Sequence, residues 1–226
     1  KECEKIMKEV ERSRRKFMVN FHQRWYPPIR KAKELVSNGK IGKPVAFYGR
    51  LSDQIKVPLE WIKWADKSGP EWFLLPHLID DAIWILGQKP KSIFAFGKKG
   101  FLKSKGINCF DHIQTIIEFQ DSIGSFESSW ILPNSWRSLI EQKLTIYGTD
   151  GKIDVGADNE GVEISGEKFE TPLIYDFLTD ELPIEYFVYC VINGIEPEPG
   201  VEEGLIVTKV IESALKSIEN KRCIKI

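Results

Sequence analysis

Hydrophobic and polar positions recur along the chain with two different periods, and each period predicts a different element. Apolar residues at helical spacing among charged ones predict an amphipathic helix over residues 2–15. The apolar run that follows, KFMVNF at 16–21, predicts a short buried strand. Helical spacing then returns at Pro27, a residue that suits a helix start, and the turn pair Asn38 and Gly39 ends that second helix.

After Pro44 the period changes to two, which is typical of strands. The strand-like stretches are VAFYGRLS, SIFAFG, HIQTIIEF, IGSFESSWI and IEQKLTIYG, with GKIDV and GVEIS as shorter candidates. Ile113 and Ile117 alternate with Gln114 and Glu118, so one sheet face is apolar and the other is semi-polar. We expect helices to cover the apolar face and water or a partner subunit to meet the other.

Two helical patterns close the chain, over residues 175–194 and 200–221. Helices before and after a run of hairpin-connected strands predict an α+β fold, with an open, mainly antiparallel β-sheet and helices on one face. The strand expected at 16–21 has no evident neighbour in this sheet, and an unpaired strand edge is unfavourable. We therefore expect residues 1–21 to be the last helix and strand of a preceding domain, and residues 22–226 to form the main domain.

Composition narrows the function classes. The chain has 226 residues and a net charge of −1, so no basic field favours nucleic acid, and no apolar run approaches the roughly 18–20 residues of a membrane span. Cys3, Cys109, Cys190 and Cys223 are widely separated and lack metal-ligand spacing. We expect reduced thiols, no metal site, no membrane or nucleic-acid partner and a cytoplasmic location.

The stretch PHLIDDAIW carries ionisable groups inside an apolar pattern. Pro76 suits a helix start, and Asp80 and Asp81 are expected in the first turn, where they interact favourably with the helix dipole. His77 lies on their face of the helix, but a helix N-terminus disfavours a charged imidazole and lowers its pKa. His77 is therefore either a structurally satisfied histidine or a neutral imidazole available for proton transfer.

Aromatic residues gather just before this helix. The residues that precede His77 in the sequence include Trp61, Trp64, Trp72 and Phe73. Aromatic faces beside a few polar groups are typical of sugar and polyol sites, and an aromatic corner of the core is the alternative interpretation.

Four motifs in the same order resemble those of the Gfo/Idh/MocA oxidoreductases. Residues 17–44 resemble the family's strand V-G-F-N-R-R-F-x-P and the helix that ends in G-x-I-G-x-P. Residues 76–97 resemble its helix G-x-H-x-x-D-x-x-x-W-L-x-G, and residues 144–155 its v-x-G-x-x-G-x-l-x-v hairpin. Residues 193–226 resemble its closing G-x-x-P loop and long helix. Each motif is weak alone, and four in register make the resemblance specific.

The resemblance implies a two-domain enzyme. An N-terminal Rossmann domain would bind NAD or NADP, and the C-terminal domain would supply substrate contacts and the oligomer interface. Residues 1–21 would be the remnant of the first domain and 22–226 the second, with a homodimer or tetramer formed through the open sheet face. No G-x-G-x-x-G loop occurs in the sequence, so it identifies no cofactor-binding residues.

Of the family's Lys–Asp–His set, only His77 is present to be carried over as the catalytic residue, because Phe73 stands where many members have aspartate and the lysine would lie upstream. Asp80 matches the H-x-x-D aspartate, and we favour a role in orienting His77 or the helix start over catalysis. Arg24 matches the second arginine of F-N-R-R, and His22 replaces its asparagine.

The expected substrate-side residues are Arg24, His22, Trp72, Trp64 and Asp80. An ordinary ion pair is the alternative role for Arg24. The function expected from the resemblance is NAD(P)-dependent oxidation or reduction of a sugar, polyol or related small hydroxy or carbonyl compound. The alternative is a non-catalytic substrate-binding or oligomerisation module, favoured by Phe73 and by the missing cofactor loop.

Overall fold

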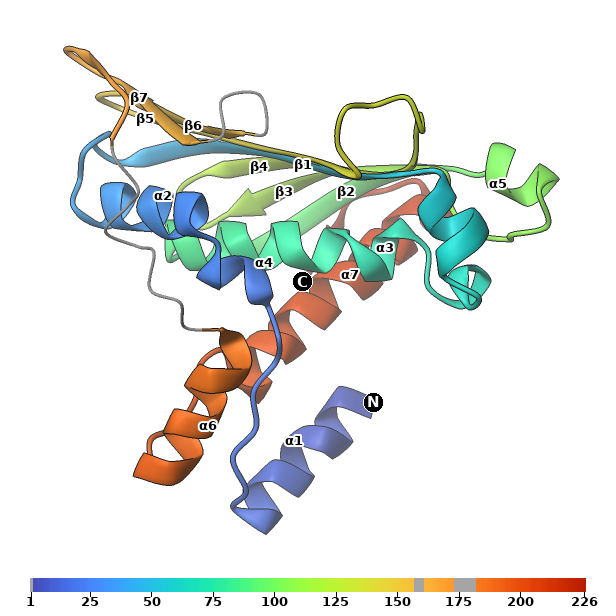
Figure 1. Ribbon diagram of the computed structural model, residues 1–226, viewed down its shortest axis with the longest axis horizontal. Coiled ribbons are helices and arrows are strands. Elements are labelled where there is room, and N and C mark those ends of the chain that lie inside the picture. The colour runs from blue at the N-terminus through green and yellow to red at the C-terminus, as the bar shows by residue number, and fades with distance from the viewer. Residues whose placement is uncertain (1, 157–160, 173–181) are drawn as a thin grey trace.

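The computed structural model describes residues 2–156, 161–172 and 182–226, which form one nine-stranded sheet with helices beneath it (Figure 1). The strands are β1 (Pro44–Gln54), β2 (Pro90–Lys98), β3 (His112–Phe119), β4 (Ile123–Leu132), β5 (Ile140–Gly148), β6 (Lys152–Gly156), β7 (Gly161–Ser165), β8 (Phe169–Glu170) and β9 (Ile224–Lys225). Their order across the sheet is β8-β7-β6-β5-β1-β4-β3-β2-β9.

The sheet is mainly antiparallel, with one parallel pair at its centre. β1 runs parallel to β4, with Gly49 opposite Phe126, and antiparallel to β5, with Gly49 opposite Leu144. The outer strands β8 and β9 are not neighbours, so the sheet is open. The expected open, mainly antiparallel sheet is confirmed.

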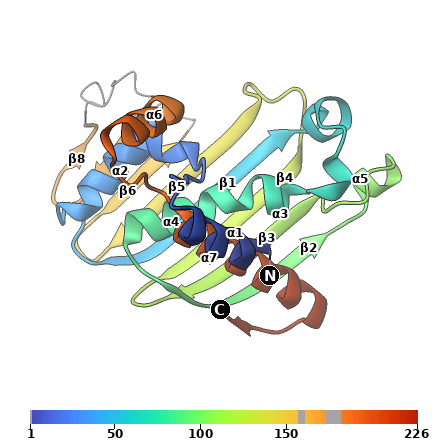
Figure 2. The same cartoon turned by 90° about the horizontal axis from the view of Figure 1, so that it is seen from below.

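The longer helices lie on one side of the sheet, as expected, while the short α5 lies beyond one end of it (Figure 1), and Figure 2 shows the helix layer from below. They are α1 (Glu2–Ser13), α2 (Pro27–Ser37), α3 (Pro70–Phe73), α4 (Leu75–Leu86), α5 (Phe101–Ser104), α6 (Pro183–Asn193) and α7 (Val201–Asn220), with short turns η1 (His22–Trp25), η2 (Val57–Trp61) and η3 (Ala65–Lys67). Among the described helices, none combines the length and apolar character needed to cross a lipid bilayer.

The core lies between the sheet and the helix layer. On β3, Ile113 and Ile117 are buried while Gln114 and Ile116 are exposed, so the period-two pattern does place one face inward. Leu78 of α4 is fully buried in the same hydrophobic cluster as the two isoleucines. Burial of this apolar surface holds α4 against the sheet.

Residues 16–21 do not form the expected strand. The backbone N–H of Val19 donates to the carbonyl oxygen of Pro199, in the loop before α7, and the N–H of Phe21 donates to Val19 itself. Phe21 is buried in the core, whereas residues 17–19 are only half-buried. The prediction was wrong because apolar residues alone do not supply the neighbouring backbone that a strand needs.

The last two expected helices are present, with one limit. Residues 173–181 lie outside the described ranges, and α6 begins at Pro183. It ends at the expected place, where Gly194 takes a left-handed φ of 70°.

Candidate active site

The helix that carries His77 begins earlier than expected. α3 ends at Phe73, and Leu74 stays in the right-handed helical region and leads directly into α4. His77 is therefore the third residue of α4, while Asp80 and Asp81 fall beyond its first turn, which holds no acidic residue. The prediction that these aspartates stabilise the first turn was wrong, and their exposures of 1% and 0% require another explanation.

Asp80 forms a buried ion pair with Arg24 of η1. The guanidinium Nε and Nη2 donate to the two carboxylate oxygens of Asp80 at 2.8 and 2.7 Å. The guanidinium also lies over the Trp84 ring, 5.4 Å from its centroid. This bidentate geometry joins two segments that are 56 positions apart and fastens η1 to α4.

Asp81 lies beside this pair and is fully buried. Neither of its carboxylate oxygens has a hydrogen-bond partner within the described part of the chain. Burial, and then the neighbouring Asp80, raises the pKa of Asp81 well above its usual value. These surroundings therefore favour the neutral, protonated form of Asp81.

A polar hollow of about 570 Å³ opens at the start of α4. It is bounded by η1, α4 and the adjoining ends of β1 and β5. The polar and titratable side chains in its wall are His22, Gln23, Tyr26, Asp53, His77 and Gln142, and the remaining wall is Leu51, Trp72, Phe73, Leu74 and Ile140. The structure thus brings three of the expected site residues, His22, Trp72 and His77, to one cavity.

His77 is held as a neutral imidazole in this hollow. Its ring lies edge-on to that of His22, with centroids 4.6 Å apart, and 6.3 Å from that of Phe21. Burial, and then the proximity of His22, lowers the pKa of His77 to about 4. The direction agrees with the expectation from sequence, although burial is the main cause.

The Nδ1 atom of His77 is buried and has no hydrogen-bond partner among the described residues. A neutral imidazole has one donor and one acceptor nitrogen, and leaving a buried nitrogen unpaired costs about 1–3 kcal/mol. This buried nitrogen is shielded from solvent, so the edge of the imidazole that lines the hollow is the part that a ligand could meet.

The other expected substrate-side residues lie elsewhere. Arg24 and Asp80 are turned toward each other, and neither is among the residues that line the hollow. Trp64 is half exposed, and it reaches the hollow only indirectly, through its ring contact with Phe73 at 6.0 Å. Trp72 does line the hollow.

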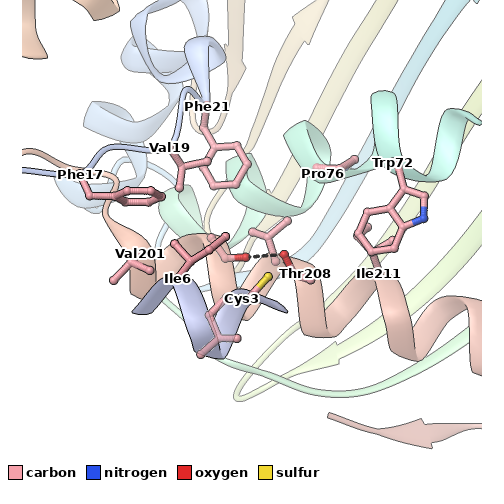
Figure 3. Close-up of a pocket in the computed structure, with 13 residues that line it drawn as sticks. Cys3, Ile6, Phe17, Val19, Phe21, Trp72, Pro76, Val201, Thr208 and Ile211 are labelled. Atoms are coloured by element: carbon pink, nitrogen blue, oxygen red, sulfur yellow. Dashed lines mark hydrogen bonds between the residues drawn. The ribbon is translucent and has the colours of Figure 1, made fainter. Parts of the chain in front are cut away.

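A second hollow, of about 230 Å³, lies on the other side of Trp72 (Figure 3). Figure 3 shows Ile6 of α1 and Thr208 of α7 near the Phe17 and Val19 side chains. The Thr208 hydroxyl donates to the Gly204 carbonyl oxygen at 2.8 Å, so its polar group is satisfied within α7. The remaining described lining is apolar apart from the Cys3 thiol, so this hollow offers little acid–base chemistry.

Sequence reasoning missed four polar residues of the first hollow, which are Gln23, Tyr26, Asp53 and Gln142. Asp53, near the end of β1, is 3% exposed, and its Oδ2 accepts the indole N–H of Trp130 at 3.1 Å. Gln142 of β5 donates to the side-chain oxygen of Gln23 at 2.9 Å. The available signal was the polar run Ser-Asp-Gln at the end of an apolar strand, where the alternation breaks.

Comparison with known proteins relates this arrangement to a family. The GFO/IDH/MocA C-terminal domain model matches residues 29–154. Inositol 2-dehydrogenase of Rhizobium meliloti (strain 1021) is 26% identical over 233 residues, 97% of this chain and 68% of the relative. D-xylose 1-dehydrogenase (NADP(+)) of Haloarcula marismortui is 22% identical over 252 residues, 99% of this chain and 67% of the relative.

A solved structure shares the fold. Levoglucosan dehydrogenase, in complex with NADH and levoglucosan, matches with a TM-score of 0.85 at 18% identity, over 99% of this chain and 70% of that chain. The chain therefore spans about two thirds of the length of each of these three proteins.

Proposed function

The chain belongs to the Gfo/Idh/MocA family and carries that family's C-terminal domain, and on this basis we propose that it is the substrate-binding part of an NAD(P)-dependent oxidoreductase. The substrate is a sugar, polyol or related small hydroxy or carbonyl compound. The observation that carries the proposal is the neutral imidazole of His77, which lines a hollow of about 570 Å³ together with other polar side chains. Cavities of this size suit small ligands.

The relatives support this substrate class by their names, which refer to inositol, D-xylose and levoglucosan. In the proposed reaction, His77 hydrogen-bonds the reacting oxygen and shares in its protonation, which requires a separation of about 3 Å. Because burial holds the pKa of His77 at about 4, the imidazole is neutral at pH 7 and has one nitrogen free to accept a proton.

The other predicted residues fall into two groups, those that contact the substrate and those that hold the site in place. His22 and Trp72 line the hollow, and we assign them to direct substrate contact. Arg24 and Asp80 act indirectly, because their ion pair holds η1 against α4. The turn η1 carries His22, and α4 carries His77. Trp64 supports the hollow through Phe73.

A nicotinamide dinucleotide supplies the hydride chemistry when it is bound. The neutral His77 and the other polar side chains of the hollow fit a substrate beside such a cofactor, but the sequence contains no G-x-G-x-x-G motif of the kind that holds a pyrophosphate. We propose that a Rossmann domain ahead of Lys1 binds NAD or NADP, and that residues 1–21 are its final part.

DNA sequencing upstream of the Lys1 codon tests this domain arrangement. The expected result is a strand followed by G-x-G-x-x-G within about 120 residues, a typical domain length. An in-frame stop codon directly before Lys1 would contradict it and would favour the non-catalytic binding module.

The catalytic role of His77 is tested in the full-length protein by steady-state oxidation of myo-inositol, D-xylose and levoglucosan with NAD⁺ or NADP⁺. We expect His77→Ala to lower kcat about 10²–10⁴-fold while cofactor binding and the circular dichroism spectrum are unchanged, because one positioned proton-sharing group is lost.

The matched control is His112→Ala, since His112 starts β3 outside the hollow. Equal turnover in wild type and His77→Ala would overturn the catalytic role. A wild-type protein that binds these polyols but never turns them over would favour the binding module.

We further propose that the protein is cytoplasmic and assembles as a homodimer or tetramer through the open face of the sheet. That face exposes Tyr48, Phe96, Ile116 and Tyr147 opposite the helix layer. Closed two-fold symmetry is the commonest arrangement for such a self-complementary surface.

A further inference from the structure

Asp53 is a buried carboxyl group at a place where ligands bind in many sheets. It lies near the carboxyl end of β1, and Trp130 lies near the carboxyl end of β4. These two strands are parallel neighbours, so both ends lie at the same edge of the sheet, where Asp53 lines the hollow that contains His77. In open α/β sheets, ligands bind outside the carboxyl ends of parallel strands.

The protein holds one oxygen of this carboxyl group in place. The indole N–H of Trp130, which is fully buried, donates to Asp53 Oδ2 at 3.1 Å. The Trp130 ring packs on Phe73, with centroids 5.5 Å apart. Asp53 Oδ1 accepts no hydrogen bond from the described residues, so one oxygen is oriented by the fold and the other remains for a ligand.

This arrangement gives Phe73 a role. At the position where the family motif has a carboxylate, this chain has an aromatic ring, and that ring packs against the tryptophan that orients Asp53. The hollow therefore has a carboxyl group, which comes from the sheet and faces the α4 side.

The electrostatic surroundings of Asp53 support a titration near neutrality. Burial raises its pKa to about 6, and the Trp130 hydrogen bond opposes that shift. The titratable groups that share the hollow are His77 of α4, His22 of η1 and Tyr26 directly after η1. From the sheet, β4 presents the uncharged Trp130, and β5 presents the uncharged Ile140 and Gln142.

We propose that Asp53 binds and orients a substrate hydroxyl next to the carbon whose oxygen His77 contacts, so that the site selects ligands with neighbouring hydroxyl groups. This inference rests on the proposed function and adds a specificity-determining residue to it. A carboxylate oxygen with no protein donor is a strong acceptor for a hydroxyl hydrogen. A ligand with a single hydroxyl would leave this oxygen unpaired in the occupied hollow.

Asp53→Asn is the informative variant, because the amide oxygen can still accept the Trp130 N–H while the charge is lost. Binding of myo-inositol, D-xylose and levoglucosan to the full-length protein is measured by calorimetry at pH 8 and pH 5. We expect Asp53→Asn to weaken binding about 10- to 100-fold at pH 8, which is the worth of a hydrogen bond to a charged group. At pH 5 the two proteins should bind alike, because wild-type Asp53 is then mostly protonated.

Two further variants separate this role from a structural one. Trp130→Phe removes the indole N–H but keeps the carboxylate of Asp53. Its ligand binding should therefore still differ between pH 8 and pH 5, a difference we call the pH step. His22→Asn removes the other group that could titrate in this window, and the step should again remain. His77, with its pKa held at about 4, stays neutral at both pH values.

The outcomes distinguish this inference from the proposed function. Equal binding by wild type and Asp53→Asn at pH 8 overturns the role of Asp53, while a loss of turnover in His77→Ala would still support the proposed function. A wild-type protein that binds none of the three compounds overturns both. Loss of the pH step in His22→Asn would assign it to His22 and also overturn the role of Asp53.

Discussion

At the scale of single residues, the most consequential feature is the ion pair between Arg24 and Asp80. Their side chains are 8% and 2% exposed, and the fully buried Asp81 lies directly beside them. Transfer of such charges from water is costly, so the pair holds only while its geometry is complete. Sequence reasoning considered both residues for substrate contact, and the structure shows their polar atoms bonded to each other.

Removal of one partner should therefore destabilise the fold strongly. We expect Arg24→Ala to lower the free energy of unfolding by about 3–5 kcal/mol, measured by urea denaturation at pH 7, because Asp80 is left as an uncompensated buried charge. Arg50→Ala is the matched control, since Arg50 is 46% exposed where it pairs with Glu127, and it should cost less than about 1 kcal/mol. Similar losses in both variants would contradict the importance of burial.

At the scale of elements, α7 is attached to the sheet by a buried hydroxyl group. Ser217 is fully buried, and its Oγ donates to the carbonyl oxygen of Arg222 at 2.7 Å and accepts the N–H of Ala95 of β2 at 3.0 Å. One side chain thus joins the end of the longest described helix to β2. The helical period of this segment predicted α7, but it could not indicate which strand the helix would meet.

The loss of this hydroxyl should be measurable. Ser217→Ala leaves a buried backbone N–H and a carbonyl oxygen without a partner, and we expect it to lower the free energy of unfolding by about 1–3 kcal/mol. In Ser104→Ala, an exposed hydroxyl bonded to Phe101 is removed, and the change should stay within about 0.5 kcal/mol. The free energies of unfolding of both variants are measured by thermal and urea denaturation. Equal effects would show that Ser217 is not an important attachment.

At the scale of the whole molecule, the sheet has one covered and one uncovered face. Tyr48 of β1 and Tyr147 of β5 pack edge-on at 5.8 Å on the uncovered face, and Ile116 of β3 is 53% exposed there. Exposed apolar side chains gathered on a semi-polar sheet face are typical of an interaction site. The proposed oligomer would bury it against a second copy.

A charge added to that face at Ile116 should separate the subunits. We expect Ile116→Lys to be monomeric by sedimentation velocity at a concentration where the wild type is dimeric or tetrameric, because two like charges would meet across a two-fold interface. Ile192→Lys on α6, where the residue is 76% exposed and away from the sheet, should leave the mass unchanged. A monomeric wild type, or an unchanged mass in Ile116→Lys, would contradict the interface.

The sequence by itself determined the local elements and the family. Period-two stretches became strands because alternation records which face of a sheet is buried, as Ile113 and Gln114 show. Pro27 and Gly194 marked helix ends because their backbone preferences are local. The order of four motifs identified the family, and His77 stood out because a histidine is unusual near a helix N-terminus.

Only the tertiary structure decided which distant residues meet. The parallel pairing of β1 with β4 places Asp53 beside Trp130, and the packing of η1 on α4 joins Arg24 to Asp80. Sequence periodicity describes a residue's neighbours along the chain, whereas these contacts depend on how complete elements pack. For the same reason, residues 16–21 have the apolar composition of a strand but do not form one. A β-ladder requires a second backbone segment beside the first, and a sequence pattern does not record which segments lie side by side.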